Sequence, residues 1–272
     1  MIERLLTVLV SVPVIFACTY FGGLWFFALV AVIATISINE LYNLMKKKGF
    51  NPYYTLGNLF NLIIITFVYN TIKHPSWEPA STAILTAAVL CCFCAGIFIK
   101  RSAHATANIS ITLLGILYVG WLFSYLVLLR ALTPHGEFLF LLMFVVWTAD
   151  TLAYFIGKQF GKRQLSPYIS PKKTIEGAVA GFAGAVIAAV LFGMAYEGTF
   201  YPVNIMHYLM IGGFVGIVGQ LSDLSESLIK RDAGAKDSSN IIPGHGGVLD
   251  RMDSFIFTAP LLYYYITTFF LK

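Results

Sequence analysis

ISITLLGILYVGWLFSYLVLLR, residues 109 to 130, is a run of 22 residues with a single charged side chain, Arg130, at its end. A helix needs about 20 apolar residues to cross the hydrocarbon core of a bilayer. The run lacks the period-two alternation of a barrel strand. Since lipid offers backbone groups no hydrogen-bond partners, a segment of this kind is expected to form a transmembrane helix.

The rest of the chain repeats this pattern. Of its 272 residues, 58% are hydrophobic and 11% are charged, and the mean hydropathy of +0.78 excludes an ordinary soluble domain. Apolar windows between polar breaks predict spans at residues 5–20, 24–44, 56–72, 81–99, 109–130, 138–157, 175–196, 204–228 and 252–271. We therefore predict an all-α, polytopic integral membrane protein with about nine transmembrane helices.

The basic residues predict the orientation of these spans, because cytoplasmic loops carry an excess of Lys and Arg. If the N-terminus is cytoplasmic, the outer loops hold only Lys73, Arg130 and Lys272 of the 18 basic residues. The inner loops hold the other 15, namely Arg4, Lys46, Lys47, Lys48, Lys100, Arg101, Lys158, Lys162, Arg163, Lys172, Lys173, Lys230, Arg231, Lys236 and Arg251. The net charge of +5 therefore indicates topology and lipid headgroups rather than nucleic acid.

Polar residues are distributed unevenly along the chain. The first five spans carry little beyond Glu40, whereas two long inner loops, near residues 158–174 and 229–251, are rich in polar and charged residues. We predict that residues 1–136 form a scaffold of transmembrane helices and residues 137–272 a catalytic half with a polar site facing the cytoplasm. Glycines at helical spacing in the seventh and eighth spans predict close helix packing.

The densest group of polar residues lies at the end of the eighth span. On a helix, Asp223 and Glu226 are three residues apart, and Ser227 and Lys230 share their face. A carboxylate and a cation on one face suit a ligand that carries both a phosphate and a metal. The alternative is a structural ion pair with a neighbouring Lys or Arg, which is the preferred interpretation for Glu226.

HGGVLDRMD, residues 245 to 253, resembles a substrate loop that leads into a helix. Gly246 and Gly247 leave backbone N–H groups open to an anion, and Asp250 and Asp253 lie one helical turn apart. Mg²⁺ is commonly held by one or two carboxylates and by the phosphates of a substrate. Asp250 alone could cap the helix, but a simple cap needs no flanking cations such as Arg251.

SPKKTIEG, residues 170 to 177, precedes the seventh span. It places Lys172 and Lys173 at a helix N-terminus, where the backbone already favours an anion. Lipid anchoring at the inner leaflet explains the charges of these two lysines equally well. Asp150 and Tyr154 could line the same cavity, or form a buried hydrogen-bonded pair.

The stretch from Ser227 to Asp253, SLIKRDAGAKDSSNIIPGHGGVLDRMD, closely resembles the signature of the phosphatidate cytidylyltransferases, or CDP-diacylglycerol synthases. DTLAYFIGK from Asp150 and SPKKTIEG from Ser170 resemble the same family. The resemblance implies Mg²⁺-dependent transfer of CMP from CTP to phosphatidic acid at the membrane. It implies metal ligands at Asp223, Asp250 and Asp253, and a second cation is a further hypothesis.

The resemblance also implies roles for the cations and for the polar residues around them. The phosphate-gripping and catalytic cations would be Lys172, Lys173, Lys230, Arg231 and Arg251. The substrate contacts would be Ser170, Ser227, Lys236, His245, Gly246 and Gly247.

Two other functions stay open. A CTP-dependent polyprenol or lipid kinase needs similar groups but transfers the γ-phosphoryl. A secondary transporter would use the intramembrane acids as an ion path, although the chain shows no inverted repeat. The absence of a transit peptide favours a bacterial plasma membrane, and the glycine-rich helix faces make a homodimer reasonable.

Overall fold

The computed structural model describes residues 2–99, 104–196, 204–242, 244 and 246–271. It divides into two compact units. The first unit comprises Met1–Gly136 and Asp232–Met252, and the second comprises Glu137–Arg231 and Asp253–Lys272. Residues 232–252 thus belong with the first unit, whereas the sequence grouped them with residues 137–272. The division into a scaffold and a catalytic half stays a prediction.

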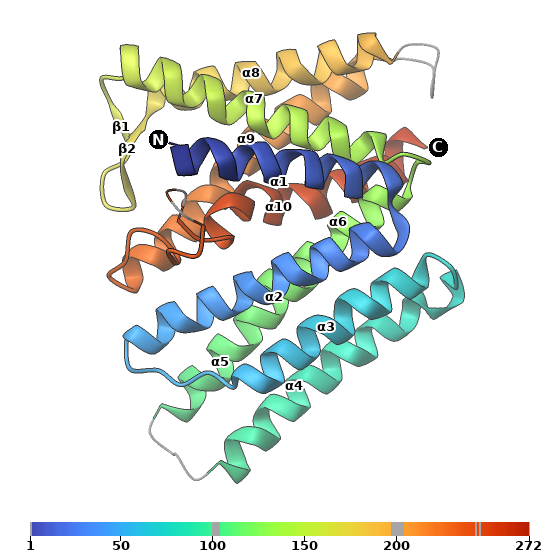
Figure 1. Ribbon diagram of the computed structural model, residues 1–272, viewed down its shortest axis with the longest axis vertical. Coiled ribbons are helices and arrows are strands. Elements are labelled where there is room, and N and C mark those ends of the chain that lie inside the picture. Colours follow the sequence, from blue (N-terminus) through green and yellow to red (C-terminus); the bar gives the residue numbers. More distant parts are fainter. Residues whose placement is uncertain (1, 100–103, 197–203, 243, 245, 272) are drawn as a thin grey trace. The chain divides into compact units, whose positions relative to one another are not determined.

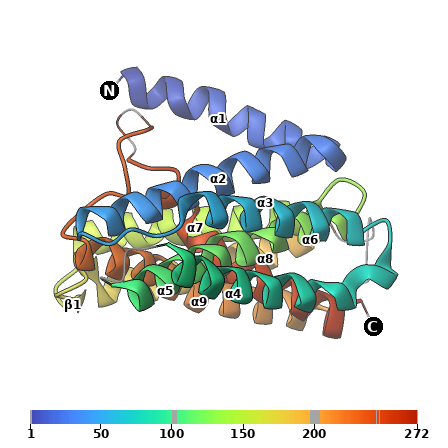
Figure 2. The ribbon, with the colours of Figure 1, turned by 90° about the horizontal axis from the view of Figure 1, so that it is seen from below.

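The first unit is a bundle of helices (Figures 1 and 2). Its elements are α1 (Ile2–Phe21), α2 (Gly23–Lys47), α3 (Tyr54–Thr71), the 3-10 segment η1 (Pro75–Ala80), α4 (Ser81–Phe98), α5 (Ala105–Gly115), the π-helical segment η2 (Ile116–Trp121) and α6 (Leu122–Ala131). Helix α2 packs against α1, α3, α5 and α6. Its Tyr42 is fully buried and donates to the Thr112 carbonyl at 2.8 Å. Gly57 and Gly115 make room for this ring, because a Cβ at either position would collide with it.

The second unit contains α7 (Glu137–Phe160), strands β1 (Gln164–Ser166) and β2 (Ser170–Thr174), and α8 (Ile175–Ala195). Helices α9 (Ile205–Asp232) and α10 (Leu249–Tyr265) cross the boundary of the units, and the π-helical segment η3 (Ile266–Phe270) follows. The strands form an antiparallel hairpin. The described chain is nearly all-α, as predicted, and this short hairpin is the one departure among the described elements. Strands of three and five residues give too short a pattern to recognise.

Glycines allow the helices of the second unit to approach closely, as the sequence predicted. A Cβ at Gly177 of α8 would lie 2.7 Å from the Ala153 carbonyl oxygen and 3.1 Å from the Gly157 Cα, both in α7. A Cβ at Gly212 of α9 would lie 2.5 Å from the Val186 Cα in α8. Any side chain at these positions would push the backbones apart.

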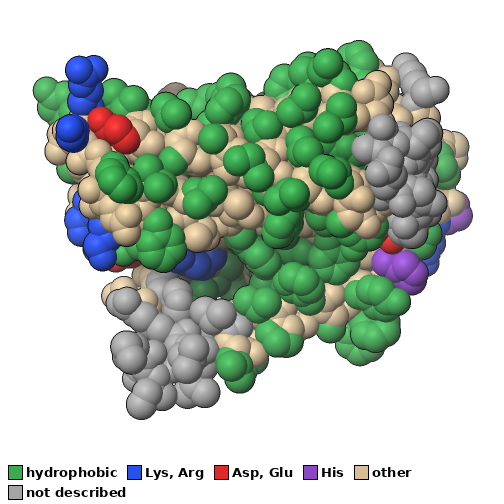
Figure 3. Space-filling view, turned by 90° about the horizontal axis from the view of Figure 1, so that it is seen from above, with side chains coloured by type: hydrophobic (Ala, Val, Ile, Leu, Met, Phe, Trp, Pro, Cys, Tyr) green, Lys and Arg blue, Asp and Glu red, His purple; other side chains and the backbone are tan. Residues whose placement is uncertain are grey.

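Each predicted span coincides with a helix or a continuous helical run of the described chain. Six of the described helices are long and apolar enough to cross a membrane, namely Gly23–Lys47, Ser81–Phe98, Ala105–Ala131, Glu137–Phe160, Ile175–Ala195 and Ile205–Asp232. Large hydrophobic side chains such as Val179, Ile187 and Leu191 of α8 are exposed, and hydrophobic side chains cover most of the face drawn in Figure 3. The protein is an integral membrane protein, and the number nine and the orientation stay predictions.

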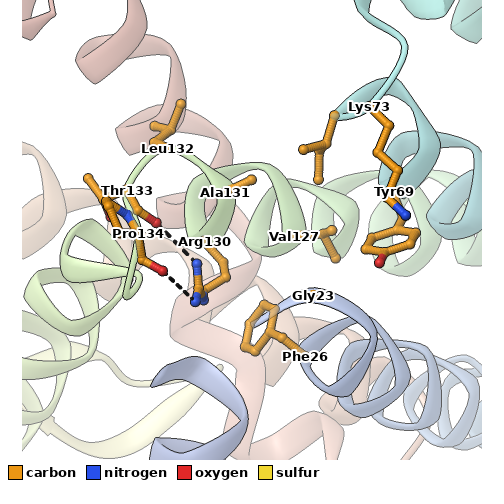
Figure 4. Close-up of a pocket in the computed structure, with 11 residues that line it drawn as sticks. Gly23, Phe26, Tyr69, Lys73, Val127, Arg130, Ala131, Leu132, Thr133 and Pro134 are labelled. Carbon is orange, nitrogen blue, oxygen red and sulfur yellow. Dashed lines mark hydrogen bonds between the residues drawn. The ribbon is translucent and has the colours of Figure 1, made fainter. Parts of the chain in front are cut away.

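Arg130, predicted to lie at the outer end of its span, has a structural role. Its guanidinium donates to the carbonyls of Pro134 at 3.0 Å and Thr133 at 3.1 Å (Figure 4). It also donates to the carbonyls of Thr19 and, at 2.8 Å, Tyr20. Thr19 and Tyr20 belong to the last turn of α1, whose carbonyl end attracts a cation. Beside Arg130 is a cavity of about 490 Å³, which Lys73 also lines. In the first unit this cavity lies at the Gly23 end of α2, and the cluster from Lys46 to Lys48 lies at the other end.

Candidate functional site

The second unit contains a cavity of about 570 Å³ that is lined by five charged residues and by apolar groups. Helix α7 and the β1–β2 hairpin supply most of its charged residues, and α8 and α9 complete it. Its lining is Asp150, Ala153, Tyr154, Gly157, Lys158, Leu165, Lys172, Lys173, Thr174, Gly177, Ala178, Gln220 and Asp223. The structure thus brings together three segments that the sequence singled out separately, around residues 150, 170 and 223. Lys158 and Gln220 line this cavity too, and the sequence reasoning gave neither a role in the site.

An ion pair joins two sides of this cavity. Lys173 of β2 pairs with the carboxylate of Asp223 in α9. The two side chains are 30% and 26% exposed, so solvent or a ligand can reach them. Lys172 is exposed, and the ammonium of Lys158 lies 5.8 Å from the centre of the Tyr154 ring. The cavity therefore offers three cations and at least two carboxylates to a charged ligand.

Hydrogen bonds from backbone N–H groups to side chains hold the hairpin in place at the N-terminus of α8. The Glu176 carboxylate accepts from the N–H groups of Lys162 at 3.0 Å and Arg163 at 3.3 Å. The Thr174 hydroxyl caps α8 by accepting from the Gly177 N–H at 3.1 Å. The glycine at 177 therefore serves both the cap and the close approach to α7. The lysines of β2 are thus carried on a strand fixed at its C-terminal end.

Arg231, predicted to grip phosphate, holds the turn of the same hairpin. Its Nε donates to the Ile169 carbonyl at 3.0 Å. This bond ties the C-terminal part of α9 to the segment between β1 and β2. The guanidinium has five N–H donors, so a contact to a ligand is compatible with this bond.

A second ion pair is buried in α9. Glu226 is fully buried, and its carboxylate pairs with the ammonium of Lys230 one turn later. This is the structural ion pair that the sequence analysis preferred for Glu226, and that interpretation is confirmed. Ser227, on the same helix, donates to Asp223 over a long distance of 3.4 Å.

Asp253 lies in a field of other carboxylates. The negative charges of Asp223 and Asp150 both act on its side chain, and the ammonium of Lys230 offsets part of this repulsion. Its carboxylate accepts from the Ser254 N–H at 2.6 Å. The Ser222 hydroxyl donates to the Asp253 main-chain carbonyl and accepts from the Phe257 N–H at 3.3 Å, which fastens α10 to α9. A cation nearby would relieve the repulsion that acts on Asp253.

In the first unit, Asp250 organises the loop that precedes α10. Its Oδ2 accepts from the Ser238 N–H at 2.9 Å, the Ser238 hydroxyl at 2.9 Å and the Gly247 N–H at 2.8 Å. Gly246 adopts a positive φ of 83° and accepts from the Ile242 N–H at 2.9 Å. A Cβ at Gly246 would lie 2.9 Å from the Asp250 Oδ2, so only glycine fits this turn.

The sequence reasoning missed Glu40, which holds the same loop. This residue of α2 is 1% exposed. Its Oε1 accepts from the Ser239 hydroxyl at 2.5 Å and the Val248 N–H at 3.0 Å, and its Oε2 from the Leu249 N–H at 2.8 Å and the Ser238 hydroxyl at 3.0 Å. The available signal was an acid inside an apolar span, which is costly unless it has partners.

The model of the cytidylyltransferase family matches residues 2–269 of this chain. The chain belongs to the cytidylyltransferase family. A phosphatidate cytidylyltransferase of Synechocystis sp. is 33% identical over 97% of this chain and 96% of its own length. The phosphatidate cytidylyltransferase of Bacillus subtilis is 33% identical over 98% of both chains, and that of Staphylococcus haemolyticus is 30% identical over 95% and 96%.

Within this member of the cytidylyltransferase family, the predicted site residues fall into three groups. Lys172, Lys173 and Asp223 line the cavity of the second unit. Ser170, Ser227, Lys230, Arg231 and Asp253 lie elsewhere in that unit, and Lys236, Gly246, Gly247, Asp250 and Arg251 in the first unit. Lys236 and Arg251 are exposed, and His245 lies outside the described residues.

The described residues contain no group of three or more His, Cys, Asp or Glu side chains close enough to hold a metal ion. Asp223 and Asp253 act on one another within the second unit, whereas Asp250 belongs to the first. The metal ligands predicted for this cytidylyltransferase-family chain therefore stay a prediction. The negative charge of the acids around Asp253 would attract a cation. A nucleotide that arrives with Mg²⁺ brings its own phosphate ligands.

Proposed function

We propose that this protein is a phosphatidate cytidylyltransferase, which transfers CMP from CTP to phosphatidic acid and releases pyrophosphate. The observation that carries the proposal is the similarity to proteins of that name along nearly the whole chain, which includes both the cavity and the signature loop. The charge of the cavity supports it, because both substrates are phosphate anions.

The reaction has one bond formed and one broken. An oxygen of the lipid phosphate attacks the α-phosphorus of CTP, and the bond from that phosphorus to the bridging oxygen breaks as pyrophosphate leaves. The nucleophile is already an anion, so the chain needs to supply little general-base catalysis. Its task is to hold two anions together and to stabilise the charge that develops on the leaving group.

The cations of the cavity suit that task. Lys172, Lys173 and Lys158 line one space, and Lys173 reaches the carboxylate of Asp223. On binding of substrate, Lys173 can exchange this carboxylate for a phosphate oxygen, since a Lys side chain is long and its ammonium has three donors. Lys230, Arg231, Lys236 and Arg251 are proposed as further phosphate contacts, and Ser170, Ser227, Gly246 and Gly247 as substrate contacts.

Mg²⁺ is the proposed cofactor, held by Asp223 and Asp253 together with Asp250. The negative charges of Asp223 and Asp150 that act on Asp253 support a cation near Asp253. A bound Mg²⁺ would neutralise the phosphates of CTP and make the α-phosphorus more electrophilic. A second cation is part of the same proposal, because more than two carboxylates take part.

The setting proposed for the reaction is the cytoplasmic side of a bacterial plasma membrane. Phosphatidic acid would reach the site from the bilayer and CTP from the cytoplasm. The exposed apolar side chains of the helices support the membrane setting, and the clustering of basic residues supports the cytoplasmic side. A homodimer stays a further proposal for the assembled form.

The test is a labelling experiment with purified protein and phosphatidic acid in detergent micelles. Label from α-labelled CTP is expected in the lipid phase in the presence of Mg²⁺, and is expected to disappear with EDTA. Label from γ-labelled CTP in lipid would instead indicate a lipid kinase. If neither label reaches lipid, the cytidylyltransferase proposal fails, and proton-flux assays in proteoliposomes would test the transporter.

A further inference from the structure

Glu40 is a buried acid whose hydrogen-bond partners lie far along the chain. It belongs to α2, whereas Ser238 and Leu249 are 198 and 209 residues away in sequence. A charged side chain inside an apolar helix is costly, so partners that satisfy it fully are needed. Four hydrogen bonds to one loop satisfy this carboxylate, and all four come from residues between 238 and 249.

The four bonds are divided evenly between the two oxygens. Each oxygen of Glu40 accepts one backbone N–H and one serine hydroxyl: Oε1 from Val248 and Ser239, and Oε2 from Leu249 and Ser238. Val248 and Leu249 are the residues at which the loop ends and α10 begins. The carboxylate therefore binds the first free N–H groups of that helix, where a negative charge is stabilising.

Ser238 joins Glu40 to Asp250. Its hydroxyl lies 3.0 Å from the Glu40 Oε2 and 2.9 Å from the Asp250 Oδ2, so the two carboxylates share its single proton, and its N–H donates to the same Asp250 oxygen. Gly247 completes the packing, because a Cβ there would collide with the Ser238 hydroxyl and lie 2.7 Å from the Glu40 Oε2. The position of Asp250 is thus coupled to Glu40 through one serine.

We propose that Glu40 is a positioning residue for the reaction, which fixes the loop 238–249 and the start of α10 so that Asp250 and the glycine turn keep one geometry. The proposal rests on the proposed function in one respect, namely that this loop serves CMP transfer. Apart from the isolated Ile242–Gly246 pairing, the described residues between Ser238 and Val248 have no regular secondary structure to hold them. Glu40 of α2 supplies the hydrogen-bond acceptors that hold the loop.

The decisive variant is Glu40→Gln, which keeps the shape of the side chain. The amide has only one acceptor oxygen, and its NH₂ group must replace the other. Because each carboxylate oxygen accepts a backbone N–H, either orientation of the amide sets an NH₂ against Val248 or Leu249. The N–H group left without an acceptor should disturb the loop and the start of α10. We therefore expect kcat/KM for CTP to fall about tenfold to a hundredfold.

Hydrogen exchange in detergent supplies a readout that does not depend on activity. In Glu40→Gln, amides of residues 238–249 should exchange faster, while those of α3 and α4 stay as in the wild type. Glu40→Asp keeps both acceptor oxygens and should recover part of the activity. Asn39→Ala is the matched control, since this neighbour in α2 bonds to Asn58 and Thr35 rather than to the loop.

Faster exchange confined to residues 238–249, with reduced CMP transfer, would support the proposal. Unchanged exchange in that loop, or faster exchange spread across α3 and α4, would overturn it whatever the activity. An effect of the same size in Asn39→Ala would overturn it too. If the wild type transfers no CMP, the proposed function fails, and faster loop exchange in Glu40→Gln would still establish Glu40 as the anchor of this loop.

Discussion

Glu40 and Asp250 of the first unit are held in a different way from Asp223 of the second unit. In the first unit, Glu40 and Asp250 accept hydrogen bonds from backbone N–H groups and from Ser238, at distances between 2.8 and 3.0 Å. In the second unit, Asp223 pairs instead with the ammonium group of Lys173. Fixed donors preserve one geometry, whereas a lysine can move to another anion. The first arrangement suits a scaffold for a loop, and the second suits a site that exchanges partners with a ligand.

The two arrangements also differ in how far their side chains are exposed to solvent. Glu40 is 1% exposed and Ser238 2%, so water cannot replace the bonds of their network. The side chains of Lys173 and Asp223 are 30% and 26% exposed, so their ion pair is screened and can be opened at modest cost. Substitutions in the second unit should therefore act on catalysis, and those in the first on loop order and catalysis together.

The largest effect is expected for Asp223→Asn. This substitution removes a negative charge that faces both Lys173 and Asp253. CMP transfer should fall by at least about a thousandfold, the scale of losing a group that stabilises transition-state charge. Thermal unfolding and gel filtration should stay close to the wild type, because the residue lines a cavity. An Asp223→Asn protein with more than a tenth of the wild-type activity would contradict the role given to this carboxylate.

A smaller effect is expected for the lysines of β2. Lys173→Ala removes a cation of the cavity and leaves Asp223 without this partner, so kcat/KM should fall about a hundredfold. Lys172→Ala, at an exposed position, should cost about tenfold. Lys47→Ala, at the exposed end of α2, is the control and should be neutral. Equal losses in all three variants would show that net positive charge at the membrane matters, rather than the cavity.

Removal of one serine hydroxyl in each unit tests the same contrast. Ser238→Ala should destabilise the first unit by about 1 to 3 kcal/mol, since it removes the hydroxyl donor next to two buried carboxylates and leaves them only their backbone and Ser239 donors. Ser227 donates to Asp223 over 3.4 Å, a long and weak bond, so Ser227→Ala should cost less than about 0.5 kcal/mol. Urea titration of both variants measures the difference. A larger loss of stability in Ser227→Ala would reverse the assignment of fixed and exchangeable networks.

Apolar length sufficed to predict the helices, because a backbone in lipid has few alternatives to a helix. The segments around Asp150, Lys172 and Asp223 were also predictable as polar sequences next to predicted spans. Their meeting in one cavity depends on the packing of α7, α8 and α9, which the glycine pattern predicted only in part. The hydrogen bonds that Glu40 accepts from Ser238 and Leu249 could not be predicted, since no local sequence pattern links residues about two hundred positions apart. The hairpin was missed because its strands of three and five residues are too short to show a pattern.

The smallest effect is expected for Lys48→Ala, which tests what holds the loop of the first unit. Lys48 pairs with Asp232 at 2.7 Å, and the side chains are 29% and 59% exposed. This pair lies near the beginning of the segment that leads to Ser238, so it is the obvious rival to Glu40 as an anchor. An exposed pair contributes between about 0 and 1 kcal/mol, because water and salt screen it. CMP transfer and exchange of residues 238–249 should both stay within about twofold of the wild type. If Lys48→Ala instead loosens the loop as much as Glu40→Gln does, buried and exposed anchors contribute equally, and the distinction drawn between fixed and exchangeable partners fails in the first unit.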